Sequence, residues 1–296
     1  MKAGIFDMPF KEYLADPCPE PALSASVIKT MLQKSPMHAA DEHPRLGNNK
    51  EEKEDSKVSR IGTVGHAIIT KQTDHRIALS PYEEFRSNEA KAWKQDALAS
   101  GKIVIKPEEY ETASKMSDSF FKNFSKNFGK VKEEFPSADF EKTIIVQMAG
   151  VWCKIRVDAI AESLWDLKST GTEYTPEKWC KNQLEGMGYD ITAAFYRRVY
   201  QELTGEHKRY IFAVLEQKSP FDSYPVIPTT DMLALADEKI DWALKTWRRG
   251  LDTGKWDGYA RGEIIFASAS PWNITAWEQF KELEKTREQI ESRKAA

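Results

Sequence analysis

The sequence predicts a single α/β domain over residues 1–296, built on a mixed central β-sheet flanked by helices. Two observations predict this fold class. Stretches with helical periodicity alternate with short apolar stretches in the order helix, strands, helix, strand, helix. The composition is 41% hydrophobic and 30% charged with a net charge of −3, which is typical of a globular chain that can bury a substantial core.

Residues 1–60 are expected to form a helical lead-in to this domain. Ser24 is placed to cap a short helix that runs through about Gln33 and ends at Ser35-Pro36. Residues 41–58 contain a run of charged side chains and indicate a flexible loop. The composition favours a solvated linker there, and a mobile loop near a substrate entrance is the alternative.

Helical periodicity predicts most of the remaining chain outside the sheet. Gly62-Thr63-Val64-Gly65-His66 is expected to begin a buried helix, with glycines that allow close packing. Further helices are predicted at 86–100, 107–134, 176–204, 230–250 and 274–294. The aromatic stripe of 107–134 indicates a packed core rather than a ligand site.

Strands are predicted where apolar, β-branched residues form short runs. The first is 143–148, which turns at Ala149-Gly150 into a hairpin that extends through 170. The run 210–215 is apolar throughout and predicts a central buried strand. A late strand is expected at 263–266.

The hairpin carries charged residues where a buried strand normally has none. Alternation places Asp166 and Lys168 on one face, and a turn centred near Glu162 places Asp158 opposite Asp166. Two carboxylates at that distance repel each other unless a cation lies between them, and hard divalent ions bind such oxygen ligands. The pattern therefore predicts a metal site for phosphodiester cleavage. A surface hairpin with a cross-strand ion pair would give the same residues, so both interpretations stay open on this stretch alone.

Composition excludes some classes of protein. No apolar run approaches the length of a membrane span, and the N-terminus lacks the apolar run of a signal peptide. We therefore expect a cytoplasmic protein with no membrane partner. The three cysteines, Cys18, Cys153 and Cys180, are too few and too scattered for a four-cysteine cluster within this chain.

The hairpin resembles motifs II and III of the PD-(D/E)xK nuclease superfamily, with Asp158 as the first acid and Asp166-Leu167-Lys168 as the (D/E)xK element. The surrounding chain is similar to phage and prophage exonucleases of the exodeoxyribonuclease VIII (RecE) type. The segments that carry this resemblance are Leu23–His38, Gly62–His66, Gly150–Asp158, Tyr189–Tyr196, Gly254–Tyr259 and Pro271-Trp272.

The resemblance implies a restriction-endonuclease-like core that binds Mg²⁺ or Mn²⁺. The implied ligands are His66, Asp158, Asp166 and the backbone carbonyl of Leu167, and Lys168 would orient the attacking water. From the residues alone, His66 is equally consistent with a buried core histidine. Glu141 is a candidate additional acid.

Two side chains near these residues have more than one interpretation. Tyr196 is a candidate donor to a site carboxylate or phosphate, although packing explains it as well. Alternation points Arg156 to the same side as Asp158, where pairing with an acid is favoured over contact with the DNA backbone.

The activity implied by the resemblance is 5′–3′ digestion of one strand of linear double-stranded DNA in a bacterial or phage-infected cell. The resulting 3′ overhang would serve a single-strand annealing protein in recombination. Related exonucleases form rings, so a homo-oligomer of three or four subunits is expected.

One position departs from the resemblance, because Thr192 stands where the family helix usually has glutamine. Thr192 is therefore left out of the expected catalytic residues. Two alternative functions remain: a RecB-like nuclease acting on single strands or DNA ends, and a catalytically silent DNA-binding scaffold with the same fold. The intact Asp158, Asp166 and Lys168 argue against the scaffold.

Overall fold

The computed structural model describes residues 2–47, 56–71, 77–127 and 137–295. The chain divides into two compact units, Met1–Asp257 and Gly258–Ala296, and each is described by itself. The charged run at 50–55, part of the loop expected near 41–58, lies outside the described residues.

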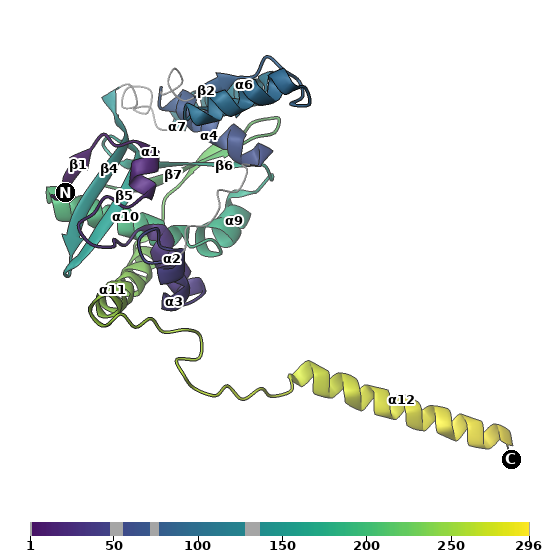
Figure 1. Ribbon diagram of the computed structural model, residues 1–296. Helices are drawn as coiled ribbons and strands as arrows, with labels where there is room; N and C mark the ends of the chain where they lie inside the picture. Colours follow the sequence, from purple (N-terminus) through teal and green to yellow (C-terminus); the bar gives the residue numbers. More distant parts are fainter. Residues whose placement is uncertain (1, 48–55, 72–76, 128–136, 296) are drawn as a thin grey trace. The chain divides into compact units, whose positions relative to one another are not determined.

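A six-stranded sheet forms the centre of the first unit (Figure 1). In spatial order its strands are β1 (Gly4–Phe6), β4 (Asp139–Met148), β5 (Val151–Ile160), β6 (Leu164–Thr170), β7 (Tyr210–Glu216) and β8 (Ser223–Val226). β6 and β7 run parallel, whereas the other neighbouring strands are antiparallel. The predicted mixed central sheet is confirmed. Every residue of β7 is buried, as expected for a central strand.

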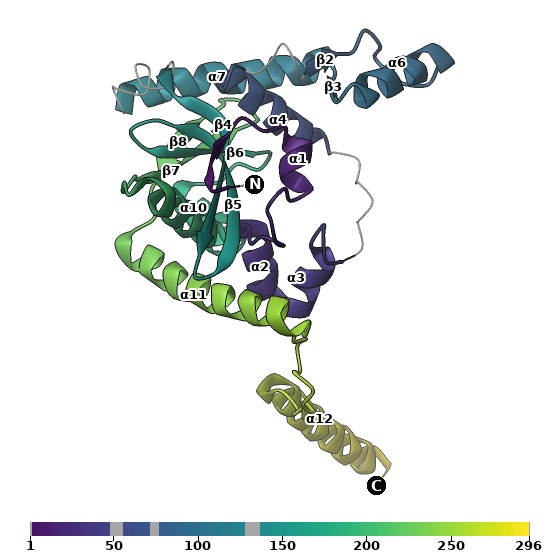
Figure 2. The same ribbon diagram turned by 60° about the vertical axis from the view of Figure 1, so that its left-hand side comes forward.

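Helices cover both faces of this sheet (Figure 2). One face carries α4 (Lys57–Ile69) and α7 (Pro107–Asn127), and the other carries α2 (Ala25–Gln33), α10 (Tyr189–Thr204) and α11 (Thr230–Thr253). Because side chains alternate along a strand, β6 and β7 contribute to both layers. Trp165 and Leu167 pack against the α7 side, whereas Leu164 and Phe212 pack in the core on the α10 side.

β5 and β6 pair only briefly before they separate. The register matches Ala159 with Trp165 and Ile160 with Leu164, and no further pair forms between these two strands within the described residues. Near the other end of β5, the N-terminal segment before α2 lies beside this strand in the place of β6. Leu23 of that segment forms an isolated parallel bridge with Cys153. Its N–H donates to the Trp152 carbonyl at 2.8 Å, and its carbonyl accepts from the N–H of Lys154 at 2.9 Å. The strands therefore form a fork, and the charged residues of the hairpin lie in it.

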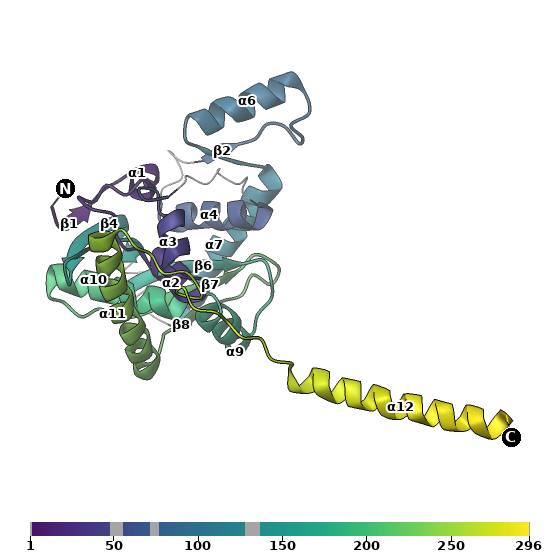
Figure 3. The same ribbon diagram turned by 60° about the horizontal axis from the view of Figure 1, so that its bottom comes forward.

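Short elements complete the first unit. They are α1 (Phe10–Leu14), α3 (Pro36–Glu42) and α9 (Pro176–Trp179), together with an arm of β2 (Ile77–Leu79), α6 (Asn88–Ala99) and β3 (Ile103–Ile105). β2 and β3 pair in parallel, and Figure 3 shows the arm projecting away from the central sheet. Ile105 at the base of the arm packs with Ile61 and Val64 of α4.

Several predicted helices differ from the structure in their bounds. Ser24 caps α2 as expected, through its side chain and the N–H of Val27. α4 begins at Lys57, five residues before the predicted start, because Ser56 caps it. The predicted helix 176–204 is interrupted by a π-helix, Cys180–Glu185, and by Gly188, whose φ is 67°. Within the described residues α7 ends at Asn127, and part of 107–134 lies outside them.

The late strand predicted at 263–266 is wrong. Ile264, Ile265 and Phe266 are 81%, 73% and 89% exposed and adopt no regular structure. An apolar run becomes a strand only where a neighbouring strand satisfies its backbone hydrogen bonds, and none pairs with this run among the described residues. The second unit is instead dominated by α12 (Pro271–Ala295), which matches the predicted terminal helix.

The helices in the part of the chain that the structure describes differ from membrane-spanning helices. None of them combines the length and the apolar character that a span requires.

Candidate active site

Three acidic residues lie in a row across three neighbouring strands. Glu141 of β4 stands between residues that pair with Val157 and Ala159, so it lies opposite Asp158 of β5. On the other side, the pairing of Ala159 with Trp165 places Asp158 next to Asp166 of β6. The structure therefore brings Asp158 and Asp166 together as the hairpin register predicts, and it adds Glu141 to the same row.

The fork between β5 and β6 determines how Asp158 is held. Where the backbone ladder stops, the Leu167 N–H donates to Asp158 Oδ2 at 2.7 Å. The Asp158 carboxylate thus accepts the hydrogen bond that this strand N–H would otherwise donate to a backbone carbonyl. Asp158 is fixed at the open end of the fork, directly beside the (D/E)xK element.

Asp166 is held by a lysine and a tyrosine. The Lys168 ammonium forms an ion pair and hydrogen bond with Asp166 Oδ1, and the Tyr210 hydroxyl donates to Asp166 Oδ2 at 2.8 Å. Burial opposes the charged form of Lys168, but the carboxylates of Asp166 and Asp158 outweigh it and raise the pKa of Lys168. Lys168 is therefore an ammonium at neutral pH, placed on the row of acids.

His66 reaches the row from α4, because two glycines let that helix approach closely. A Cβ on Gly62 would overlap the Ser169 side chain of β6, and a Cβ on Gly65 would overlap Met116 of α7. His66 Nδ1 consequently lies 3.8 Å from Asp158 Oδ2. Burial and the nearby Lys168 charge lower the pKa of His66 to about 4, so the ring is neutral at pH 7 and able to ligate a cation.

The backbone of Leu167 also lies at His66. A hydrogen bond between this backbone and the imidazole opposes the lowering of the His66 pKa. The four groups expected to bind a metal ion, which are His66, Asp158, Asp166 and the Leu167 carbonyl, are therefore drawn from one small region of the fold. Their chemistry, two carboxylates with an imidazole and a carbonyl oxygen, suits a divalent cation.

Electrostatics at Asp158 supports that fit. Burial and the neighbouring Asp166 carboxylate raise the pKa of Asp158 well above its ordinary value, and Glu141 adds to the effect. The positive charge near Asp158 is therefore too small to offset the negative charges of the neighbouring carboxylates. Within the described ranges no three histidine, cysteine or acidic side chains converge closely enough to hold an ion as they stand. Each Asp166 oxygen accepts one hydrogen bond, from Lys168 or from Tyr210, and keeps a second lone pair that can face an ion.

Glu141 and Tyr196, the two accessory candidates, each contact another side chain near the row of acids. Glu141 accepts from Arg156 Nε at 2.8 Å, so Arg156 pairs with an acid. Tyr196 packs edge-on against Tyr210, with ring centroids 5.8 Å apart, and burial raises its pKa far above the ordinary value. Tyr196 is a neutral phenol at the edge of the row.

Two cavities flank the row and share Tyr13, Arg156, Asp158, Lys168 and Tyr196. The larger, of about 450 Å³, also reaches His66 and Phe10. The smaller, of about 210 Å³, lies against α2 and α10 and also reaches Lys29, Tyr189 and Thr192. The row of acids is therefore open to a cavity on either side.

The smaller cavity contains a second ammonium group. The Nζ atoms of Lys29 and Lys168 each lie 5.1 Å from the centre of the Tyr189 ring. Burial and the charge of Lys168 lower the pKa of Lys29. Thr192 lines the same cavity, and its buried hydroxyl oxygen has no hydrogen-bond partner among the residues that the structure describes.

Tyr210 and Lys29 were not found by sequence reasoning. Tyr210 begins an apolar run, and its contact with Asp166 depends on the parallel pairing of β6 and β7, which no local pattern specifies. Lys29 lies within the Leu23–His38 segment of the resemblance, yet nothing in its spacing indicated that it reaches the acids.

Comparisons with known proteins support the fold. The family model described as "PDDEXK-like domain of unknown function (DUF3799)" matches residues 24–260. A crystal structure from Eubacterium rectale named "Putative exonuclease" matches with a TM-score of 0.55 and 15% identity, covering 92% of this chain and 99% of that one. A second solved structure, SSO0001, covers 73% of this chain and 84% of its own at 14% identity, and its TM-score of 0.23 carries no argument. Among curated proteins none matches.

Proposed function

The chain belongs to the PDDEXK-like family whose model it matches, and from that premise we propose that it is a metal-dependent nuclease that hydrolyses phosphodiester bonds in DNA. One observation supports this proposal above the others. Asp158, Asp166 and Lys168 meet at the fork between β5 and β6, with His66 at 3.8 Å from Asp158. In an ordinary surface ion pair, the positive partner lowers the pKa of the carboxylate. The pKa of Asp158 is instead raised, by burial and by Asp166.

In the proposed reaction, His66, Asp158, Asp166 and the Leu167 carbonyl would hold Mg²⁺ or Mn²⁺. The bound ion would lower the pKa of a water molecule and stabilise the charge that develops on the phosphate. Lys168 would orient the attacking water and offset negative charge. Tyr210 keeps Asp166 in position through its hydrogen bond. Lys29 adds positive charge on the other side of the row, where a phosphate of the substrate would lie.

The finer proposal is a 5′–3′ exodeoxyribonuclease that acts on linear double-stranded DNA and leaves 3′ overhangs. Its support is the resemblance to exodeoxyribonuclease VIII-type enzymes and the name of the Eubacterium rectale protein. On the same basis, a single-strand annealing protein is the proposed partner in recombination. A homo-oligomeric ring of three or four subunits and a cytoplasmic location in a bacterial or phage-infected cell also belong to this proposal.

End-labelled linear DNA tests the function. Duplexes labelled at the 5′ or the 3′ end are incubated with Mg²⁺ or with EDTA, using wild type, Lys168→Ala and the control Lys239→Ala. Lys239 forms an ion pair with Asp190 on α10 and lies outside both cavities. We expect metal-dependent release of the 5′ label by wild type and by Lys239→Ala, and a loss of at least about 100-fold in Lys168→Ala.

The other outcomes separate the alternatives. Cleavage in EDTA, or full activity of Lys168→Ala, would contradict the mechanism. Preferential digestion of single strands would favour a RecB-like nuclease. Binding of DNA without cleavage under any divalent metal would identify a catalytically silent scaffold.

A further inference from the structure

Helix α1 contributes two aromatic side chains to the larger cavity. Phe10 and Tyr13 line it together with His66, Asp158 and Lys168. Its volume of about 450 Å³ falls in the range of roughly 300–1,000 Å³ that small-ligand sites occupy. The cavity therefore has an aromatic wall and a charged wall, and only the charged wall has a role in the proposed hydrolysis.

The two rings are stacked, with centroids 6.3 Å apart and planes inclined by 18°. The Arg156 guanidinium lies over the Phe10 ring at 5.8 Å, and Lys154 Nζ lies over the Tyr13 ring at 4.7 Å. Phe10 nevertheless remains 48% exposed, so part of its ring is open to the cavity and to solvent. Such a stack of rings and cations can accept a further flat π system on its open surface.

The stack is held firmly on the sheet. Arg156 Nη1 donates to the Met8 carbonyl at 2.7 Å, and Lys154 Nζ donates to the Tyr13 carbonyl at 2.6 Å. β1, just before α1, is the edge strand of the sheet and pairs with β4. These contacts place Phe10 and Tyr13 at the site through the backbone, rather than through side-chain packing alone.

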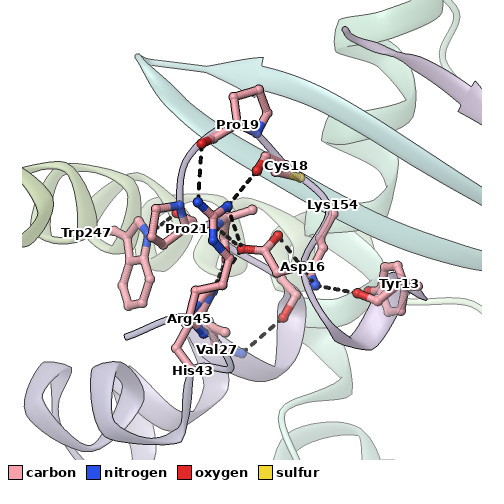
Figure 4. A network of polar contacts seen from close by, with 12 residues as sticks. Tyr13, Asp16, Cys18, Pro19, Pro21, Val27, His43, Arg45, Lys154 and Trp247 are labelled. Atoms are coloured by element: carbon pink, nitrogen blue, oxygen red, sulfur yellow. Dashed lines mark hydrogen bonds and ion pairs between the residues drawn. The ribbon is translucent and has the colours of Figure 1, made fainter. Parts of the chain in front are cut away.

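A buried network anchors the chain that follows α1. Figure 4 shows Arg45, His43 and Lys154 gathered round the Asp16 carboxylate. The Ala22 N–H donates to Asp16 Oδ2 at 3.0 Å, and Asp16 itself has a φ of 60°, which turns the chain back toward β5. The aromatic pair is thus tied to the sheet on both sides of α1, as a preorganised binding surface would be.

We propose that the Phe10–Tyr13 pair binds a nucleobase by stacking, and so holds the nucleotide next to the scissile phosphate. The inference rests on the proposed function and names the part of the substrate that this wall contacts. Every base has a π face, so a stacking wall binds DNA without selecting sequence, as an enzyme that digests any DNA end requires. The row of acids would face the phosphate while the aromatic wall holds the base.

Binding can be measured without cleavage. Lys168→Ala is used as the background, in Ca²⁺, with a DNA end that carries 2-aminopurine as its terminal base, because its fluorescence reports stacking. Phe10→Ala and Phe10→Trp are compared with Leu14→Ala. Leu14 lies on the same helix and is 51% exposed, yet it lines neither cavity of the site. A matching DNA end with an abasic terminal site supplies the second control.

We expect Phe10→Ala to raise the Kd for the base-containing end about tenfold and to reduce fluorescence quenching. Phe10→Trp should keep the Kd and the quenching close to those of the protein with Phe10, and Leu14→Ala should change neither quantity. On the abasic end, Phe10→Ala should have no effect, because no base remains to stack. Circular dichroism of each variant shows whether it is folded.

Results that contradict the stacking role differ from results that contradict the proposed nuclease function. An unchanged Kd in Phe10→Ala, or an equal loss on the abasic end, would overturn the stacking role alone. Binding that depends on Phe10 in a protein that never cleaves DNA would overturn the nuclease and leave the stacking site. If Lys168→Ala binds no DNA end in Ca²⁺, the stacking proposal fails, whereas cleavage of labelled DNA by wild type in Mg²⁺ decides the nuclease function separately.

Discussion

The Leu167 N–H donates to the Asp158 carboxylate at 2.7 Å, just beyond the last backbone pair between β5 and β6. This contact joins the first acid to the backbone of the (D/E)xK element. It keeps Asp158 close to Asp166 although the two carboxylates repel each other. The fold therefore stores an unfavourable interaction at this point, which is common at functional sites.

Asp158→Asn is expected to stabilise the metal-free protein and to abolish cleavage. Burial and Asp166 raise the pKa of Asp158, so its ionised form costs stability at every pH above the ordinary carboxyl pKa. Asparagine removes that charge and can still accept from Leu167. We expect a gain of about 1 kcal/mol, or roughly 2–4 °C in Tm, in EDTA at pH 7.5.

Asp241→Asn is the matched control, because Asp241 is 56% exposed and pairs with Arg198 away from the site. Thermal unfolding gives the Tm of both variants, and digestion of DNA with Mg²⁺ gives their activity. A lower Tm for Asp158→Asn would show that the carboxylate is structural, contrary to the electrostatic argument.

The row of acids could be predicted because a hairpin register follows from two local features. Strand alternation and the turn near Glu162 together place Asp158 opposite Asp166. The contacts of Tyr210 with Asp166 and of Phe10 with the larger cavity depend instead on parallel pairing and on the buried Asp16 network. Those relationships join distant parts of the chain, and no sequence period encodes them. The exposed run at 263–266 had strand-like composition but no partner strand, which a local pattern cannot reveal.

Tyr210→Phe is expected to lower kcat about tenfold and leave KM unchanged. The Tyr210 hydroxyl donates to Asp166 Oδ2 from a buried position, so its loss frees Asp166 to change orientation without touching the substrate. The lost hydrogen bond should also cost roughly 1 kcal/mol of stability. Steady-state digestion and urea unfolding measure the two effects.

Tyr224→Phe serves as the comparison, since the Tyr224 hydroxyl donates to the Tyr174 carbonyl at 3.1 Å and lines neither cavity of the site. It should show a similar stability loss with unchanged kcat. If Tyr210→Phe digests DNA at the wild-type rate, Tyr210 does not position Asp166.

Stability is expected to fall as pH drops below about 6.5 because of His43. Burial lowers the pKa of His43, although Asp16 opposes the effect; Lys154 and Arg45 also face this group. The unfolded chain therefore binds a proton at a higher pH than the folded chain does, and stability is lost as pH falls through the unfolded pKa. The loss falls between pH 7.5 and 5.5, the interval that contains the ordinary histidine pKa.

Urea unfolding at both pH values tests this expectation in wild type and His43→Gln. The difference in unfolding free energy between the two pH values should be smaller in His43→Gln than in wild type. His207→Gln, at an exposed position, should behave as wild type. An unchanged pH dependence in His43→Gln would mean that other groups cause it.

Removing residues 258–296 is expected to leave the first unit folded. All members of the four hydrophobic clusters found among the described residues come from Met1–Asp257. The family match also ends at residue 260. Since the core loses no member, the Tm of residues 1–257 should lie within about 2 °C of the full chain. Differential scanning calorimetry measures it, and a large fall in Tm or a loss of cooperative unfolding would show that the second unit contributes to the stability of the first.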